Sequence, residues 1–252
     1  MGQSLEQQIA VIIPALNESE NLKWLLPNLC PRYRVIVVDN GSDDGTAQVA
    51  KSLGARVLSE SRRGYGIAVQ KGMKDLQGAD AAGETPPKAV VVFDADGTSP
   101  WEDIGRVSKL VLDGHADLVI GQRMNRDPGA MPTHARFGNW LAVTFIQMFA
   151  GYRFLEMGSL RAIGWRALLQ LEMEDPTWGW NVEMQVKSAM RGLRIIEIPI
   201  EYRCRVHGLS KISGSLVGSL RAGAKIIYAI FKYSWTEWRR RLLKPQASSP
   251  DP

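Results

Sequence analysis

Short apolar runs alternate with longer stretches of mixed polarity along the first half of the chain. Each run is too short for a helix and is bounded by Gly, Pro, Asn or Asp, which predicts a buried strand. These strands are expected at residues 9–13, 35–38, 56–58, 90–93 and 118–120. Helices are expected over about 17–26, 46–53 and 67–76, and a fourth begins at a predicted capping box, residues 99–102. The alternation predicts an α/β fold with a mostly parallel sheet and flanking helices.

The second half of the chain is less regular. Helices are expected over 137–149 and 181–190, a strand and a helix within 160–171, and a strand over 195–202. We divide the chain into a globular domain, 1–215, a basic amphipathic helix, 216–244, and a disordered tail, 245–252. The amphipathic helix ends in Trp235, Trp238 and an arginine run. This composition fits both a helix in a membrane interface and a C-terminal helix packed on the domain.

Charged or polar side chains follow every predicted strand of the first half. Glu18, Asp39, Arg63, the pair Asp94 and Asp96, and Arg123 stand in these places. The carboxyl ends of parallel strands meet at one edge of a sheet, and ligands of open α/β sheets bind there. The sequence therefore predicts a single site at this edge.

The aspartate pair indicates the chemistry of that site. Asp94 and Asp96 lie on the same side of an extended chain, because side chains alternate with a period of two. Two such carboxylates can hold a hard divalent cation, which in turn can hold a diphosphate. A surface turn after a strand has the same composition, so the motif alone leaves both interpretations open.

Composition restricts the partners. The chain has 252 residues, a net charge of +5 and an isoelectric point of about 9.3, which suits anionic ligands or surfaces. Cys30 and Cys204 show no metal-ligand spacing and offer no disulfide framework. No apolar stretch reaches the roughly 20 residues of a spanning helix, and no signal peptide is recognised. We expect a cytoplasmic protein without a nucleic-acid partner.

Several motifs together resemble a known family. Residues 14–18 (PALNE), 37–46 (VVDNGSDDGT) and 94–96 (DAD) stand in order at the spacing of the family-2 glycosyltransferases with the GT-A fold. Residues 121–123, 136–139, 179–184 and 199–211 are similar to the dolichyl- and polyprenyl-phosphate sugar transferases. The resemblance covers about residues 9–215. It implies a Rossmann-like, nucleotide-sugar-binding fold and an inverting transfer of a hexose to a lipid phosphate, on the cytosolic face of a membrane.

The resemblance also implies roles for individual residues. The nucleotide would be held by Pro14, Leu16, Glu18, Asp39, Arg63, Asp94 and Ala95. Asp94 and Asp96 would hold Mg²⁺ or Mn²⁺ against the diphosphate, with Asp96 favoured as the direct ligand. Arg205 and Lys211 would neutralise the leaving diphosphate, and the acceptor would meet Arg123, Arg136 and Glu183. The donor, linked to uracil or guanine, and its sugar stay open.

Two alternatives remain at this stage. Glu156 stands where relatives usually have Asp, and it is a candidate base if the acceptor is a hydroxyl rather than a phosphate. Residues 93–98 also fit the first motif of haloacid-dehalogenase-type phosphatases, with Asp94 as nucleophile. That fold needs a further acidic pair after a later strand, and none follows Ile120 or Ile198.

Overall fold

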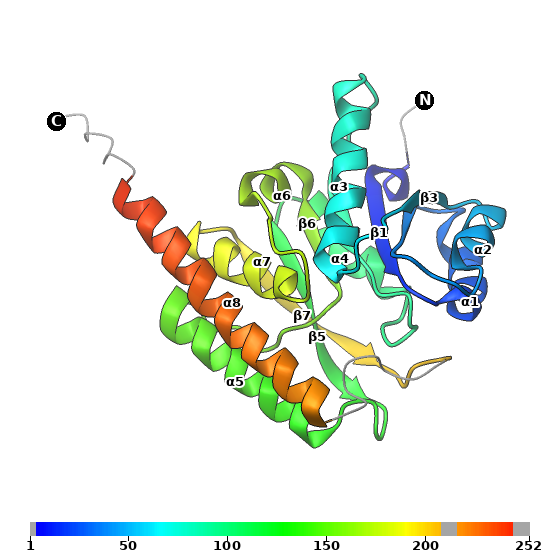
Figure 1. Ribbon diagram of the computed structural model, residues 1–252. Coiled ribbons are helices and arrows are strands. Elements are labelled where there is room, and N and C mark those ends of the chain that lie inside the picture. The colour runs from blue at the N-terminus through cyan, green and yellow to red at the C-terminus, as the bar shows by residue number, and fades with distance from the viewer. Residues whose placement is uncertain (1–3, 208–215, 244–252) are drawn as a thin grey trace.

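The computed structural model describes residues 4–207 and 216–243, apart from the side chains of residues 125 and 216–222. One seven-stranded sheet forms its centre, in the order β3-β2-β1-β4-β6-β5-β7 (Figure 1). The strands are β1 (Ile9–Ala15), β2 (Arg34–Asp39), β3 (Arg56–Ser59), β4 (Ala89–Val92), β5 (Leu118–Arg126), β6 (Arg161–Gly164) and β7 (Ile195–Tyr202). Only β6 runs antiparallel to its neighbours. The predicted mostly parallel sheet is confirmed.

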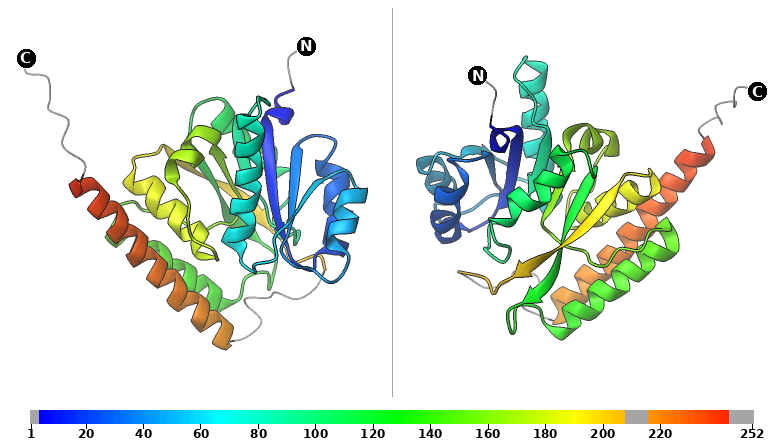
Figure 2. Two further views of the ribbon diagram at one scale, coloured as in Figure 1. Left: turned by 45° about the horizontal axis from the view of Figure 1, so that its top comes forward. Right: turned by 180° about the vertical axis from the view of Figure 1, so that it is seen from behind.

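Helices cover both faces of the sheet (Figure 2). They are α1 (Ser19–Leu29), α2 (Thr46–Ser52), α3 (Tyr65–Ala81), α4 (Asp103–Leu112), α5 (Thr133–Ala150), α6 (Trp165–Leu171), α7 (Gly179–Met190) and α8 (Leu216–Leu243), after a 3₁₀ turn, η1 (Glu6–Gln8). Successive residues of β1 enter opposite cores: Ala10 and Ile12 pack under α3 and α7, and Val11 and Ile13 under α1 and α4. Because both faces are covered, the central strands β1 and β4 are apolar throughout rather than alternating.

Three predicted boundaries are wrong. Strand β1 runs through Pro14, which was expected to end it. Strand β4 pairs with β1 only as far as Ile12, so the missing N–H of Pro14 breaks no strand hydrogen bond. Helix α3 continues to Ala81, through residues expected to form a loop. The capping box at 99–102 does not form, since α4 begins at Asp103 without a side-chain cap.

Helices α5 and α8 lie side by side in the same direction along one flank of the molecule (Figures 1 and 2). Near the C-terminal end of α5, the ring of Phe149 lies 4.4 Å from that of Phe231 on α8. Helix α8 also packs on α7, through Ile230 and Tyr233. Among the described residues, no helix combines the length and the hydropathy that a bilayer crossing requires. The predicted tail lies outside the described residues.

Candidate functional site

A cavity of about 690 Å³ opens at the carboxyl edge of the parallel strands. The segments that follow β1, β2, β3 and β4 and the end of β5 all contribute to it, as predicted from the strand ends. The part of the lining that comes from the strand ends and from Arg205 consists of Pro14, Leu16, Glu18, Asn40, Arg63, Asp94, Ala95, Asp96, Arg123 and Arg205. All of these except Asn40 are expected there from the sequence. One cleft therefore gathers residues that are far apart along the chain.

Asp94 and Asp96 occupy different environments within this cavity. Burial, and then the negative charge of Asp96, raise the pKa of the Asp94 carboxyl to about 6. Asp96 Oδ1 accepts hydrogen bonds from the backbone N–H and the hydroxyl of Thr98, at 3.0 and 2.7 Å. Its Oδ2 lies 3.6 Å from Arg205 Nη1. Thr98 and Arg205 thus fix Asp96 in place, while Asp94 is half-buried in the cavity lining.

Arg161 is a buried cation that interacts with Asp94 and that was not predicted from the sequence. Strand β6 pairs it with Val92 and Ile120, so it lies beside the ends of β4 and β5. Its guanidinium donates to the carbonyl oxygen of Asn181 at 3.1 Å, and burial lowers its pKa to about 10. Its positive charge favours the ionised form of Asp94. A charged residue within the apolar run 160–163 was the available signal.

Arg205 connects the segment 205–207 to the edge of the cavity. It forms an ion pair with Glu18, and its Nε donates to the carbonyl oxygen of His207 at 2.9 Å. Asn21 accepts the backbone N–H of His207 at 3.1 Å and donates to Glu18 at 2.5 Å. Glu18 and Arg205, assigned separately from the sequence, form one unit with Asp96. Lys211 lies outside the described residues.

Asn40 organises the loop after β3. Its side-chain amide donates to the carbonyl oxygens of Glu60 and Arg62, at 3.0 and 2.7 Å, and accepts the N–H of Gly64 at 2.8 Å. The loop thereby presents Arg63 and Gly64 to the cavity. Asp39, by contrast, is buried, accepts the N–H of Ser42 at 3.3 Å and does not line the cavity. Asn40 rather than Asp39 is therefore the residue that reaches the cavity from this turn.

The carboxylate of Glu156 is not free to act as a base in this structure, because it is paired with Arg123. Its carboxylate accepts Arg123 Nε at 2.6 Å and the backbone N–H of Arg123 at 2.7 Å. It is 2% exposed and does not line the cavity. The guanidinium of Arg123 also lies 5.0 Å above the ring of Tyr202. Arg123 reaches the cavity as one half of a buried ion pair, which leaves Glu156 without access to an acceptor in this structure.

Glu183 and Arg136 also lie away from the cavity lining. Glu183 is fully buried, accepts the backbone N–H groups of Glu174 and Asp175, and pairs with Lys187 Nζ at 2.6 Å. Arg136 is exposed on the first turn of α5. Neither side chain lines the cavity, and a contact of either with the acceptor stays a prediction. Helix α7 directs Glu183 into the protein, where it holds the chain segment before α7.

The opposite end of the cavity is apolar. Met131, Pro132 and Ala135 at the start of α5, Met157, and Ile226 on α8 form its walls, with Lys225 beside them. Lys225 is exposed and makes no ion pair with any residue in the described part of the chain. Trp178 and Thr177, just before α7, form another wall. The cavity thus connects a charged end to an apolar end that carries one cation.

The aspartate pair fits a divalent cation only in combination with another ligand. Within the described ranges, no group of three or more His, Cys, Asp or Glu side chains has the geometry to hold a metal. Mg²⁺ is commonly held by one or two carboxylates and completes its shell with water and phosphate oxygens. The raised pKa of Asp94 reflects burial and repulsion between the carboxylates, which a bound cation would offset. The residues therefore fit a metal that arrives with a phosphate-bearing ligand.

Comparison with protein families and sequences gives consistent matches. The model of the glycosyl transferase family 2 matches residues 10–169. An uncharacterized glycosyltransferase of Mycobacterium tuberculosis is 38% identical over 216 residues, which are 85% of this chain and 94% of that protein. A dolichyl-phosphate hexose transferase of Haloferax volcanii is 32% identical, over 87% of this chain and 92% of its own. An undecaprenyl-phosphate mannosyltransferase of Micrococcus luteus is 34% identical, over 84% and 90%.

Solved structures agree on the fold. Glucosyl-3-phosphoglycerate synthase from Mycobacterium tuberculosis, in complex with Mg²⁺ and uridine diphosphate, superposes with a TM-score of 0.68 at 19% identity. The match covers 93% of this chain and 85% of that one. A mannosyl-3-phosphoglycerate synthase from Rubrobacter xylanophilus gives a TM-score of 0.64 at 18% identity, over 94% and 76%.

Proposed function

Since the chain belongs to glycosyl transferase family 2 and has the GT-A fold, we propose that it moves a hexose from a UDP- or GDP-linked donor to a polyprenyl phosphate, with inversion. The single observation that carries this proposal is the two-ended cavity, whose acidic and cationic end suits a nucleoside diphosphate and whose apolar end suits a lipid. The relatives named for dolichyl- and undecaprenyl-phosphate support the acceptor. Membership of this family does not support the alternative of a haloacid-dehalogenase-type phosphatase.

The donor is assigned to the charged end. The segments at Pro14–Leu16 and the loop at Arg63 bind the nucleoside, and Arg205 neutralises the diphosphate. Asp94 and Asp96 would hold the divalent cation, which would offset the charge that develops on the diphosphate when the bond to the sugar breaks. Arg205, ion-paired to Glu18 and lying 3.6 Å from Asp96, is already fixed beside that charge. Preorganised cations of this kind stabilise the transition state more than the ground state.

The reaction requires no separate base. A phosphate oxygen of the acceptor attacks the anomeric carbon on the face opposite to the diphosphate, and the bond from that carbon to the diphosphate oxygen breaks. The electron pair leaves with the nucleoside diphosphate, and the product is a polyprenyl-phosphate sugar. A phosphate monoester is largely ionised at neutral pH, so no proton has to be removed. A hydroxyl acceptor needs a base, and the ion pair between Glu156 and Arg123 makes that alternative less favourable.

A membrane contact completes the proposal. Phe137 and Trp140 on α5 and Trp235 and Trp238 on α8 expose about half or more of their surface, at 61%, 57%, 59% and 48%. Aromatic side chains beside exposed arginines are typical of helices in a bilayer interface. The apolar end of the cavity includes Ala135 on α5 and Ile226 on α8, so a lipid acceptor would enter from the membrane side.

The test of this function is a transfer assay with matched acceptors. Purified protein, Mg²⁺ or Mn²⁺ and radiolabelled UDP- or GDP-hexoses are incubated with undecaprenyl phosphate or with undecaprenol, which lacks the phosphate. Labelled lipid is expected with the phosphate acceptor only. Transfer to undecaprenol at a similar rate would instead support a hydroxyl acceptor, and release of free sugar alone would contradict both.

Lys225→Ala is expected to raise KM for undecaprenyl phosphate by about tenfold, because one charge-assisted hydrogen bond to the acceptor phosphate is lost. KM for the nucleotide sugar should not change, since Lys225 lies at the apolar end. Arg241→Ala is the matched control, because it removes a positive charge from the same helix about 24 Å along its axis. Equal effects of the two variants on this KM would contradict a contact between Lys225 and the acceptor phosphate and would indicate a general electrostatic attraction to the membrane.

A further inference from the structure

The loop between α6 and α7, residues 172–178, forms one wall of the cavity, and we call it the wall loop. Thr177 and Trp178 line the cavity from this loop. On one side it rests on α3. Gln70 Nε2 donates to the carbonyl oxygen of Asp175 at 3.0 Å, and the N–H of Ile67 donates to that of Pro176 at 3.1 Å. The contact is so close that a Cβ on Gly66 would overlap the Asp175 carbonyl oxygen.

On its other side the wall loop is held by α8, through a buried hydrogen bond. The Tyr233 hydroxyl donates to Asp175 Oδ2 at 3.0 Å. Asp175 Oδ1 accepts the backbone N–H and the hydroxyl of Thr177, at 2.8 and 2.9 Å. Asp175 therefore connects a side chain of α8 directly to a residue of the cavity lining. Tyr233 is fully buried, so water does not substitute for this contact.

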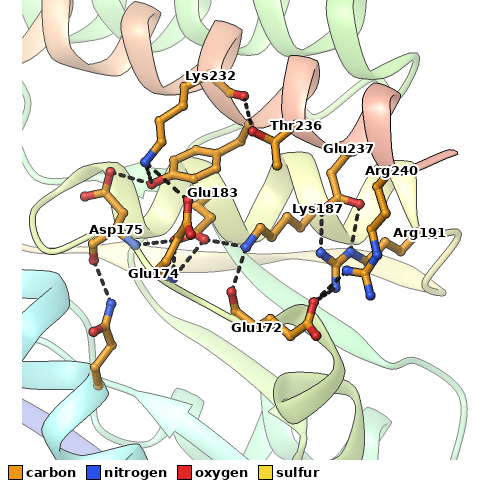
Figure 3. A network of polar contacts seen from close by, with 12 residues as sticks. Glu172, Glu174, Asp175, Glu183, Lys187, Arg191, Lys232, Thr236, Glu237 and Arg240 are labelled. Atoms are coloured by element: carbon orange, nitrogen blue, oxygen red, sulfur yellow. Dashed lines mark hydrogen bonds and ion pairs between the residues drawn. The ribbon is translucent and has the colours of Figure 1, made fainter. Parts of the chain in front are cut away.

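Ion pairs around this contact attach α8 to the same loop along its length (Figure 3). Lys232 Nζ lies 3.2 Å from Glu174, and Arg240 Nη1 lies 2.6 Å from Glu172. Arg191 on α7 pairs with Glu237 of α8. A shift of α8 would thus be transmitted to the wall loop at several points.

The outward side of α8 carries an apolar stripe. We define the outer stripe as Tyr228, Phe231, Trp235, Trp238 and Leu242, which are 66%, 45%, 59%, 48% and 65% exposed. The spacing of three and four residues places them on one helix face. Arg239 and Arg241 are exposed beside them. Apolar aromatics flanked by cations match the surface of an anionic bilayer, and this argues for a membrane rather than a protein partner.

We propose that α8 couples membrane docking to the cavity: the outer stripe binds an anionic bilayer, and Tyr233 and Asp175 act as positioning residues that pass this fixation to the wall loop. The coupling rests on the proposed function only for its effect on turnover. In the free protein the wall loop depends on a helix with one unsupported face. On a bilayer, α8 is held from both sides, and Thr177 and Trp178 are fixed where the acceptor lies.

The first readout does not depend on activity. Amide hydrogen exchange of the wall loop is measured with and without vesicles of phosphatidylcholine and phosphatidylglycerol in equal amounts. In the unmodified protein, vesicles are expected to slow this exchange by about tenfold, the effect of one hydrogen bond to a carboxylate. Tyr233→Phe should bind vesicles equally well in a flotation assay and show no slowing. Thr236→Val removes from the same helix a hydroxyl that donates to the carbonyl oxygen of Lys232, and it should behave like the unmodified protein.

Turnover provides the second readout. With farnesyl phosphate as a soluble acceptor, vesicles should stimulate transfer by the unmodified protein and by Thr236→Val, and not by Tyr233→Phe. Trp235→Glu should lose both vesicle binding and stimulation. Circular dichroism and melting temperature confirm that each variant is folded.

Two results would overturn the coupling: vesicle-slowed exchange in Tyr233→Phe equal to that of the unmodified protein, or a dimer in solution that Trp235→Glu dissolves while no vesicle binding occurs. Slowed exchange without any sugar transfer would instead remove the proposed function and leave the coupling in place.

Discussion

Replacing Asp96 by Asn is expected to lower kcat for sugar transfer by about 10³-fold, on the scale of losing one preorganised electrostatic contact in a transition state. Asn keeps the size of the side chain and an oxygen that accepts the two hydrogen bonds from Thr98. It lacks the negative charge that holds a divalent cation. The fold should therefore persist, and the rate of labelled lipid formation is the measurement.

The control is Asp80→Asn, which removes an exposed carboxylate near the end of α3, away from the cavity. It should transfer sugar at the normal rate. For the unmodified protein, excess EDTA should stop transfer, and added Mg²⁺ or Mn²⁺ should restore it. Full turnover in EDTA, or normal turnover of Asp96→Asn, would contradict the metal-assisted mechanism.

Glu183→Ala is expected to lower the free energy of unfolding by about 3–5 kcal/mol, the usual loss when one partner of a buried ion pair is removed. Lys187 would be left as a buried charge at 3% exposure. The N–H groups of Glu174 and Asp175 would also lose their acceptor. Urea unfolding followed by circular dichroism gives the free energy.

Two further variants test whether the loss in Glu183→Ala comes from the buried ion pair. Glu84→Ala removes an exposed partner of Arg34 at 3.7 Å and should cost about 1 kcal/mol or less. The double variant Glu183→Ala with Lys187→Met should be less destabilised than the sum of the single variants, because it leaves no unpaired charge. A loss below about 1 kcal/mol for Glu183→Ala would show that its ion pair with Lys187 is not structural.

Local sequence patterns were sufficient to predict the position of a residue wherever that position depends on a single strand or helix. The apolar run at 90–92 must be buried on both faces, and the aspartates after it must then lie at the edge of the sheet. The same reasoning predicted the positions of Glu18, Arg63 and Arg123 at that edge. It did not show that Asn40 rather than Asp39 lines the cavity, because which of two adjacent side chains turns into the cavity depends on the loop packed against them.

The sequence by itself determined the fold, the family and the edge of the sheet where the site lies, since strand periodicity and short motifs are local properties of the chain. Only the tertiary structure decided which charged side chains face the cavity and which form ion pairs inside the protein. Glu156 and Glu183 carry the same group as Asp96, yet each is neutralised by a cation, Arg123 or Lys187, that burial forces close to it. The roles of Arg161 and Tyr233 also depend on the tertiary structure, because a buried polar group needs a hydrogen-bond partner, and the fold decides which element supplies it.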